Sequence, residues 1–283
     1  MPHQSKFPYT LTMTKSRKLP RFSLPIALLM LFVMACSLVV YYYFHKTQEI
    51  VLTDSTVIPE IEYIEYQTGV DPAFSVIWLH GLGADGHDFE PIAPQLEISA
   101  DVAVRFIFPH APERAITVNG GMVMRGWYDI VDLPVDPKQT RREDRAGLEE
   151  SYAIVRELIA QENRRGIPTE NIFLAGFSQG GAVALFAGLR LEQKIAGIIA
   201  LSTYLPHAGK LEVERSEANR DVAVFYGHGT QDPLIPLEAA EKSRDLLEAF
   251  DYSVEWHTYE MPHSVHPAEI RQIGEFINRL LIH

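Results

Sequence analysis

Residues 176–180 read Gly-Phe-Ser-Gln-Gly and match the pattern G-x-S-x-G. In this pattern a serine sits on a sharp turn between a strand and a helix, where its hydroxyl can act as a nucleophile. The flanking sequence favours that setting, because an apolar run before Gly176 is typical of a buried strand and the run after Gly180 of a helix. Both glycines have a steric reason, since side chains there would collide with the strand and the helix. The alternative role for Ser178 is a plain helix N-cap.

A serine nucleophile needs a base, and the base needs an acid to orient it. With a strand-turn-helix serine, the chain order of these groups is serine, then acid, then histidine. Asp232 fits the acid, because it follows the apolar run 222–226 and so lies beyond the carboxyl end of a predicted strand. Asp221 precedes that strand and would lie at the opposite edge of the sheet. An Asp-Pro turn with Pro233 is the alternative role for Asp232.

Four histidines follow Asp232 and are candidates for the base, at positions 257, 263, 266 and 283. His263 falls in the loop beyond the predicted strand 253–259, where the other two groups are expected. His257 lies inside that strand, and His266 directly precedes Pro267 at a predicted helix start. We therefore predict His263 as the base, with His266 as the second choice.

The transition state of such a reaction also needs two preorganised N–H donors for the developing oxyanion. One is expected from the backbone of Gln179, the residue after the serine. The other is expected from the loop after an early strand, and the glycine-rich run HGLGADG at 80–86 has that place. The histidines and aspartates in and after this run match no recognised metal-ligand spacing, so neither a metal nor a cofactor is predicted.

Short β-rich runs that alternate with longer amphipathic runs must position these groups. This alternation predicts an α/β fold with an open, mostly parallel sheet and helices on both faces. The predicted strands are 61–66, 75–79, 104–108, 171–175, 195–201, 222–226 and 253–259. The predicted helices are 89–96, 144–163, 180–191, 237–250 and 267–281.

The first residues have a different character from the rest of the chain. Residues 1–23 carry five Lys or Arg and no acidic residue, and residues 24–44 carry no charge at all. About 20 apolar residues suffice for a helix to cross a bilayer, and basic residues before such a span stay on the cytoplasmic side. We therefore predict a cytoplasmic tail at 1–23, a transmembrane signal anchor at 24–44, a linker at 45–57 and a catalytic domain at 58–283 on the non-cytoplasmic (periplasmic) side.

Two other interpretations of the apolar segment remain open. A cleaved signal peptide would have a shorter apolar region and a small-residue cleavage site. The run Val33-Met34-Ala35-Cys36 resembles a bacterial lipoprotein signal, in which Cys36 is lipidated, although the apolar run continues through Val40. Each interpretation exports the domain or attaches it to a membrane.

Composition excludes several classes of protein. The chain has 283 residues with 25 Lys or Arg and 37 Asp or Glu, a formal charge of −12. Because the basic tail holds five of the positive charges, the remaining body is more acidic still and should repel the phosphates of nucleic acid. The single cysteine excludes an internal disulfide framework and a thiolate-rich metal site.

Five ordered motifs together resemble one known family. They are HGLGADG (80–86), NGGMVMRGWYDI (119–130), GFSQGG (176–181), GTQDPLIP (229–236) and MPHSV (261–265). This set is similar to the carboxylesterase, acyl-protein thioesterase and lysophospholipase family of α/β-hydrolases, and the likeness runs from about residue 60 to the end. The resemblance implies an α/β-hydrolase fold and familiar members that are mostly soluble cytosolic enzymes, from which the N-terminal segment departs.

By the same resemblance, Ser178 is the nucleophile, Asp232 the acid and His263 the base. The oxyanion donors fall on the backbones of Leu82 and Gln179. A loop containing Met122, Met124 and Trp127 would border the acyl groove, with core packing as its alternative role.

The sequence thus predicts a serine carboxylesterase that acts through an acyl-enzyme on carboxylic esters, with thioesters or lysophospholipids as further substrates. The expected partners are a small ester or lipid substrate and, through the N-terminal segment, a membrane. A catalytically silent, membrane-tethered α/β-hydrolase binding module is the alternative. The oligomeric state does not follow from the sequence.

Overall fold

The computed structural model describes residues 61–132 and 142–281. Every described residue belongs to one compact unit, Ile58–His283. The predicted tail, apolar segment and linker lie outside the described residues. The predicted domain boundaries therefore stay predictions.

A seven-stranded sheet forms the centre of the described unit. Its strands are β1 (Tyr63–Gln67), β2 (Phe74–Leu79), β3 (Val104–Pro109), β6 (Ile172–Phe177), β7 (Gly197–Leu201), β8 (Val224–Gly229) and β9 (Val254–Tyr259). They lie in the order β1-β3-β2-β6-β7-β8-β9. β1 pairs antiparallel with β3, and every other neighbouring pair is parallel. The loops that follow β2, β6, β8 and β9 therefore meet at one edge of the sheet, where α/β proteins bind ligands.

The strands in the middle of the sheet are mostly apolar. Every residue of β3 and β7 is buried, as expected of strands that are covered on both faces. All seven strands predicted from the sequence are present, shifted by a few residues at most. The mostly parallel α/β fold is confirmed.

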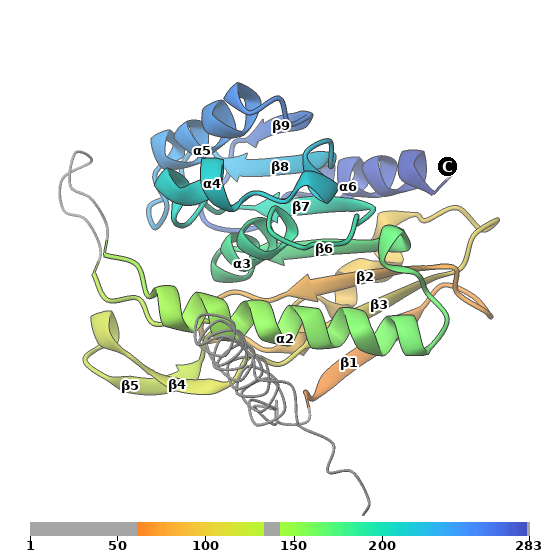
Figure 1. Cartoon of the computed structure of the whole chain (residues 1–283), viewed down its shortest axis with the longest axis horizontal. Helices are drawn as coiled ribbons and strands as arrows, with labels where there is room; N and C mark the ends of the chain where they lie inside the picture. The colour runs from red at the N-terminus through yellow and green to blue at the C-terminus, as the bar shows by residue number, and fades with distance from the viewer. Residues whose placement is uncertain (1–60, 133–141, 282–283) are drawn as a thin grey trace, which may run out of the picture. The chain divides into compact units, whose positions relative to one another are not determined.

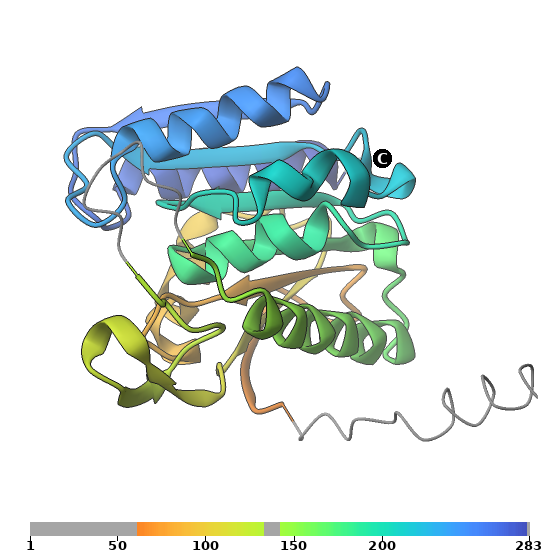
Figure 2. The ribbon, with the colours of Figure 1, turned by 60° about the vertical axis from the view of Figure 1, so that its left-hand side comes forward.

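Helices cover both faces of the sheet. They are α2 (Arg145–Arg164), α3 (Gln179–Gly188), α4 (Leu211–Glu214), α5 (Leu237–Ala249) and α6 (Pro267–Leu280). One buried apolar cluster packs α2, α3, α4 and α5 on one face, and a second packs α6 with the 3-10 helix η2 (Glu90–Leu96) on the other. Figures 1 and 2 show this arrangement, with α6 behind the sheet in Figure 1. Further 3-10 helices are η1 (Gly86–Asp88), η3 (Thr117–Asn119), η4 (Thr169–Asn171), η5 (Ala208–Lys210) and η6 (Glu217–Asn219).

The start and stop of α2 follow from its terminal residues. The side chain of Asp144 accepts a hydrogen bond from the backbone N–H of Gly147 and so caps the first turn. The chain leaves the helix through Gly166, whose φ of 95° suits glycine and disfavours other residues. The predicted helix 144–163 is therefore confirmed, with its stop signal at the glycine.

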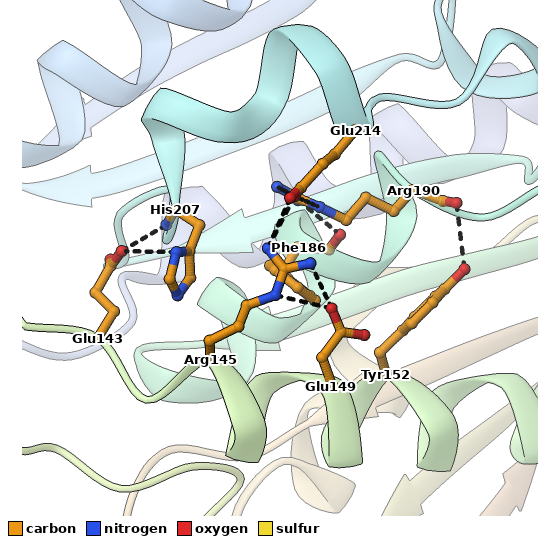
Figure 3. A network of polar contacts seen from close by, with 8 residues as sticks. All are labelled: Glu143, Arg145, Glu149, Tyr152, Phe186, Arg190, His207 and Glu214. Atoms are coloured by element: carbon orange, nitrogen blue, oxygen red, sulfur yellow. Dashed lines mark hydrogen bonds and ion pairs between the residues drawn. The ribbon is translucent and has the colours of Figure 1, made fainter.

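A polar network joins α2, α3 and α4 on the front face (Figure 3). The carboxylate of Glu214 lies 2.9 Å from the guanidinium groups of both Arg145 and Arg190. Both guanidinium groups also lie over the ring of Phe186, 5.0 Å and 4.1 Å from its centre. The two cations thus share one anion and one aromatic face, which ties α4 to the start of α2 and the end of α3.

The structure differs from the sequence-based expectation in two places. The predicted helix 89–96 is a 3-10 helix, Glu90–Leu96, with Pro94 inside it. A two-stranded hairpin, β4 (Glu113–Ile116) and β5 (Met122–Arg125), was not predicted. The transmembrane helix predicted at 24–44 lies outside the described residues, and within 61–132 and 142–281 no helix is long and apolar enough to cross a membrane.

Candidate active site

Ser178 lies at the turn between β6 and α3. Its backbone angles are φ 54° and ψ −117°, a strained conformation for a residue other than glycine. A Cβ on Gly176 would lie 2.3 Å from the backbone of Gly180, and a Cβ on Gly180 would lie 2.2 Å from the carbonyl oxygen of Leu79. Only glycines allow this turn. Ser178 occupies the N-cap position of α3 but its side chain makes no capping hydrogen bond, so capping does not account for the serine.

Asp232 and His263 form a hydrogen-bonded pair at the same edge of the sheet. Asp232 lies in the loop after β8 and His263 in the loop after β9, and Asp232 Oδ2 lies 2.6 Å from His263 Nδ1. The side chain of Asp232 is fully buried and that of His263 is 13% exposed. The other carboxylate oxygen of Asp232 accepts backbone N–H groups from Leu234 at 2.8 Å and Ile235 at 2.9 Å. The acid is thus fixed in position on both of its oxygens.

These hydrogen bonds keep Asp232 ionised. Burial by itself raises the pKa of the carboxyl, but the hydrogen bonds from His263 and from the backbone of Ile235 and Leu234 outweigh it. The pKa of Asp232 is therefore below its ordinary value. A charged carboxylate is what the orienting acid of a hydrolase requires.

The ring of His263 also packs beside the turn that carries the serine. Its centre lies 4.7 Å from the ring centre of Phe177, the residue before Ser178. Within the described residues, the Ser178 hydroxyl makes no hydrogen bond to His263. The structure thus brings together the acid and the histidine, and it places the serine next to them.

The other two histidine candidates are engaged elsewhere. Nδ1 of His266 accepts the backbone N–H of Ala268 at 3.1 Å and so caps α6. His257 lies within β9, where its ring stacks on Phe225 with centres 5.1 Å apart. Among the described residues neither forms a hydrogen bond or ion pair with Asp232, so geometry favours His263 over both.

The loop after β2 lies against the serine turn. A Cβ on Gly81 would lie 3.6 Å from the Cβ of Ser178. The next residue, Leu82, makes no backbone hydrogen bond through its N–H among the described residues. As the first residue of α3, Gln179 likewise has an N–H without an acceptor in the helix. Two backbone donors thus flank the serine from two different elements.

His80 fixes the start of this loop. Its ring is buried, Nδ1 donates to the carbonyl oxygen of Gly81 at 2.7 Å, and Nε2 accepts the N–H of Ala111 at 3.0 Å. Burial lowers the pKa of His80 to about 4, so the ring stays neutral. His80 is therefore a structural residue of this loop, and the described residues contain no cluster of three or more His, Cys, Asp or Glu that could hold a metal ion.

The hairpin β4–β5 carries two of the three predicted groove residues. Met122 is 62% exposed, and the sulfur of Met124 lies 3.6 Å from the place where a Cβ of Gly83 would be. Trp127 follows the hairpin and is fully buried, with its indole N–H donating to the carbonyl oxygen of His80 at 2.8 Å. This burial agrees with the core-packing alternative for Trp127.

The serine turn, the Asp–His pair and the two backbone donors are the groups that a serine hydrolase requires. Comparison with known proteins supports this interpretation. The sequence matches the phospholipase/carboxylesterase family model over residues 64–281. The chain belongs to this family. Acyl-protein thioesterase 1 of Neurospora crassa is 41% identical over 212 residues, covering 73% of this chain and 86% of that protein. Acyl-protein thioesterase 1 of Mycosarcoma maydis is 36% identical over 232 residues, covering 77% and 95%.

Solved structures agree with this membership. Arabidopsis thaliana SOBER1 matches with a TM-score of 0.68 at 31% identity, covering 74% of this chain and 99% of that chain. Acyl-protein thioesterase 2 of Zea mays matches with a TM-score of 0.67 at 24% identity, a likeness that shows the fold alone. The protein is therefore a serine hydrolase with the α/β-hydrolase fold. Its membership of this family supports hydrolysis of an ester or thioester bond. The alternative of a silent membrane-tethered binding module has no support among these relatives.

The predicted localisation, with the hydrolase domain on the non-cytoplasmic side of a membrane, is wrong. The curated relatives that the chain matches are acyl-protein thioesterases, and no helix among residues 61–132 and 142–281 is long and apolar enough to cross a membrane. Membrane association through the N-terminal segment is likewise unsupported. The segment 24–44 and Cys36 lie outside the described residues.

Proposed function

We propose that the protein hydrolyses carboxylic esters and thioesters of acyl chains, lysophospholipids included, through Ser178, His263 and Asp232. The hydrogen bond of 2.6 Å between Asp232 and His263, at the sheet edge that carries the strained serine turn, is the observation that carries this proposal. The relatives named acyl-protein thioesterase support the thioester part of it.

The proposed reaction has two halves. Ser178 Oγ attacks the acyl carbon while His263 Nε2 takes the hydroxyl proton, and Asp232 stabilises the imidazolium that forms. The N–H groups of Leu82 and Gln179 donate to the oxyanion of the tetrahedral intermediate. The intermediate collapses to an acyl-enzyme, and His263 returns the proton to the leaving alcohol or thiol. Water then attacks the acyl carbon by the same route and releases the acid and free Ser178.

The missing hydrogen bond between Ser178 and His263 is compatible with this reaction. In enzymes without substrate, the hydrogen bond between nucleophile and base is often long and shortens only when substrate binds. The ring of His263 already lies on Phe177 beside the serine. The first proton transfer requires the Ser178 hydroxyl and His263 Nε2 to come within hydrogen-bond distance when substrate binds.

The acyl chain is proposed to lie along the hairpin. Met122 is exposed there, and Met124 lies next to the loop that holds Leu82, so flexible apolar side chains border the reacting carbon. Trp127 supports this border from the buried side. Rates on esters and thioesters of graded chain length would define the acyl preference.

The nucleophile is tested by Ser178→Ala. We expect the variant to fold normally, to lose at least about 10³-fold in kcat on a chromogenic ester, and to resist labelling by a fluorophosphonate probe. Ser253→Ala is the matched control, because Ser253 is exposed and precedes β9 at the opposite edge of the sheet. Turnover or labelling of Ser178→Ala at the level of the Ser253→Ala control would refute the assignment.

A further inference from the structure

The side chain of Gln179 is buried and fully used. Only 3% of the residue is exposed, although it directly follows the serine turn. Its Oε1 accepts the backbone N–H of Trp127 at 2.8 Å, and its Nε2 donates to the carbonyl oxygen of Tyr128 at 2.7 Å. These two partners fix the orientation of the carboxamide, since the donor and the acceptor could not be exchanged. The start of α3 is thereby tied to a segment far away in the sequence.

That segment also holds the other oxyanion loop. Residues 125–128 are here called the bridging segment. The carbonyl oxygen of Arg125 in this segment accepts a hydrogen bond from the N–H of Gly83 at 2.8 Å. The indole N–H of Trp127 donates to the carbonyl oxygen of His80 at 2.8 Å. The two contacts lie on either side of Leu82. One short piece of backbone therefore contacts both elements from which the oxyanion donors come.

The bridging segment is itself held firmly. The N–H of Gly126 donates to the carbonyl oxygen of Pro112 at 3.0 Å, and its carbonyl oxygen accepts from Arg114 Nε at 2.7 Å. The hydroxyl of Ser151 in α2 donates to the carbonyl oxygen of Trp127. A Cβ on Gly126 would lie 3.0 Å from the side chain of Leu82, so a glycine lets the segment approach the loop closely. Because the bridging segment is fixed in this way, it can hold the loop of Leu82 and the start of α3 at a set separation.

We propose that the Gln179 side chain is a positioning residue, which acts through the bridging segment to fix the spacing of the two oxyanion N–H donors. The inference rests on the proposed function, in which those donors are the backbones of Leu82 and Gln179. Oxyanion stabilisation depends on donors that are already in place before charge develops. A displacement of about 1 Å in such a group can cost about 10²-fold in rate.

Two substitutions test this role while leaving the Gln179 backbone N–H in place. Gln179→Met keeps the length of the side chain but removes both hydrogen bonds. Gln179→Glu keeps both when protonated, because its carbonyl oxygen can accept from Trp127 and its hydroxyl can donate to Tyr128. When ionised, it places a charged acceptor against the carbonyl oxygen of Tyr128 and loses that bond.

We expect Gln179→Met to lower kcat about 10- to 100-fold at every pH, with KM changed less than about threefold. Gln179→Glu should show the same loss at pH 8, and its kcat relative to that of the wild type should recover as the pH falls to 5. His80, the nearby buried histidine, does not mimic this recovery, because burial lowers its pKa to about 4 and keeps the ring neutral. Gln95→Glu is the control, since Gln95 is exposed and bonds only to its own helix.

The outcomes separate this inference from the proposed function. If Ser178→Ala abolishes turnover while both Gln179 variants keep the wild-type kcat, the positioning role is overturned and the proposed function stands. A change confined to KM, or a loss in Gln179→Glu that does not recover at low pH, also overturns it. Circular dichroism at each pH identifies unfolding, and activity lost through unfolding alone would count against positioning. If Ser178→Ala stays active, the proposed function itself fails.

Discussion

The hydrogen bond between Asp232 and His263 determines which ring nitrogen of the histidine is free to act. Because the Asp232 carboxylate can only accept, His263 Nδ1 must carry the proton, and Nε2 is then left as the acceptor for the serine proton. The low pKa of Asp232 maintains this arrangement over the range in which the enzyme would work. The acid thus controls the base through its charge and through the tautomer.

Asp232→Asn should remove both forms of control with little change in shape. Its amide N–H would face His263 Nδ1 and select the tautomer with the proton on Nε2, which cannot accept from Ser178. We expect kcat to fall about 10³- to 10⁴-fold, measured on the ester used for Ser178→Ala. Asp221→Asn is the control, because Asp221 pairs with Lys194 on the surface and precedes β8. A loss below tenfold in Asp232→Asn would exclude Asp232 as the orienting acid.

At the scale of elements, the site depends on how closely α3 approaches the end of β2. These two elements carry Gln179 and the loop with Leu82, and Gly180 is the point of contact. A Cβ there would lie 2.2 Å from the carbonyl oxygen of Leu79 and 2.6 Å from that of His80. Both obstacles are backbone atoms, so relief requires the helix to move away from the strand.

Gly180→Ala should therefore lower stability and activity together. We expect a loss of about 1–3 kcal/mol in the free energy of unfolding, measured with urea, and a fall in kcat because the two oxyanion donors move apart. Gly209→Ala should change stability by less than about 0.5 kcal/mol, because nothing lies within 4 Å of its added Cβ. Equal stability and equal kcat in the two variants would contradict the close approach of α3 and β2.

Local sequence patterns predict some of these elements and miss others. Apolar periodicity located the seven strands of the sheet, and strand ends then selected Asp232 over Asp221 and His263 over His257. The hairpin β4–β5 was missed because its strands are short and partly exposed, although Asn119-Gly120 between them is a recognised turn signal. The hydrogen bonds of Gln179 depend on backbone about 50 residues earlier, and no local pattern encodes such a contact. The apolar composition of residues 24–44 is a property of that segment alone, and the location of the catalytic domain could not be predicted from it.

At the scale of the whole molecule, one buried acid links α6 to the sheet. Glu269 in the first turn of α6 is fully buried, and its Oε2 accepts the N–H of His266 at 3.2 Å. Its Oε1 makes no hydrogen bond in the described residues and lies where a side chain on Gly227 of β8 would be. Burial raises the pKa of Glu269 to about 8, against the opposing effect of the His266 N–H. The folded protein thus keeps this carboxyl protonated near neutral pH.

This proton couples the stability of the entire unit to pH. Between the ordinary value of 4.5 and about 8, the folded state holds a proton that the unfolded state releases, so the free energy of unfolding falls as the pH rises. The slope from this group is at most about 1.4 kcal/mol per pH unit. Glu269→Gln stays neutral and should remove that slope. The difference in free energy of unfolding between this variant and the wild type, measured with urea, should therefore increase from pH 5 to 8 and stay constant above pH 8. Glu275→Gln, an exposed position on the same helix, should leave the slope unchanged. If the free energies of unfolding of Glu269→Gln and the wild type depend on pH in the same way, the Glu269 carboxyl has an ordinary pKa in the folded protein. The coupling proposed here between its proton and stability would then be wrong.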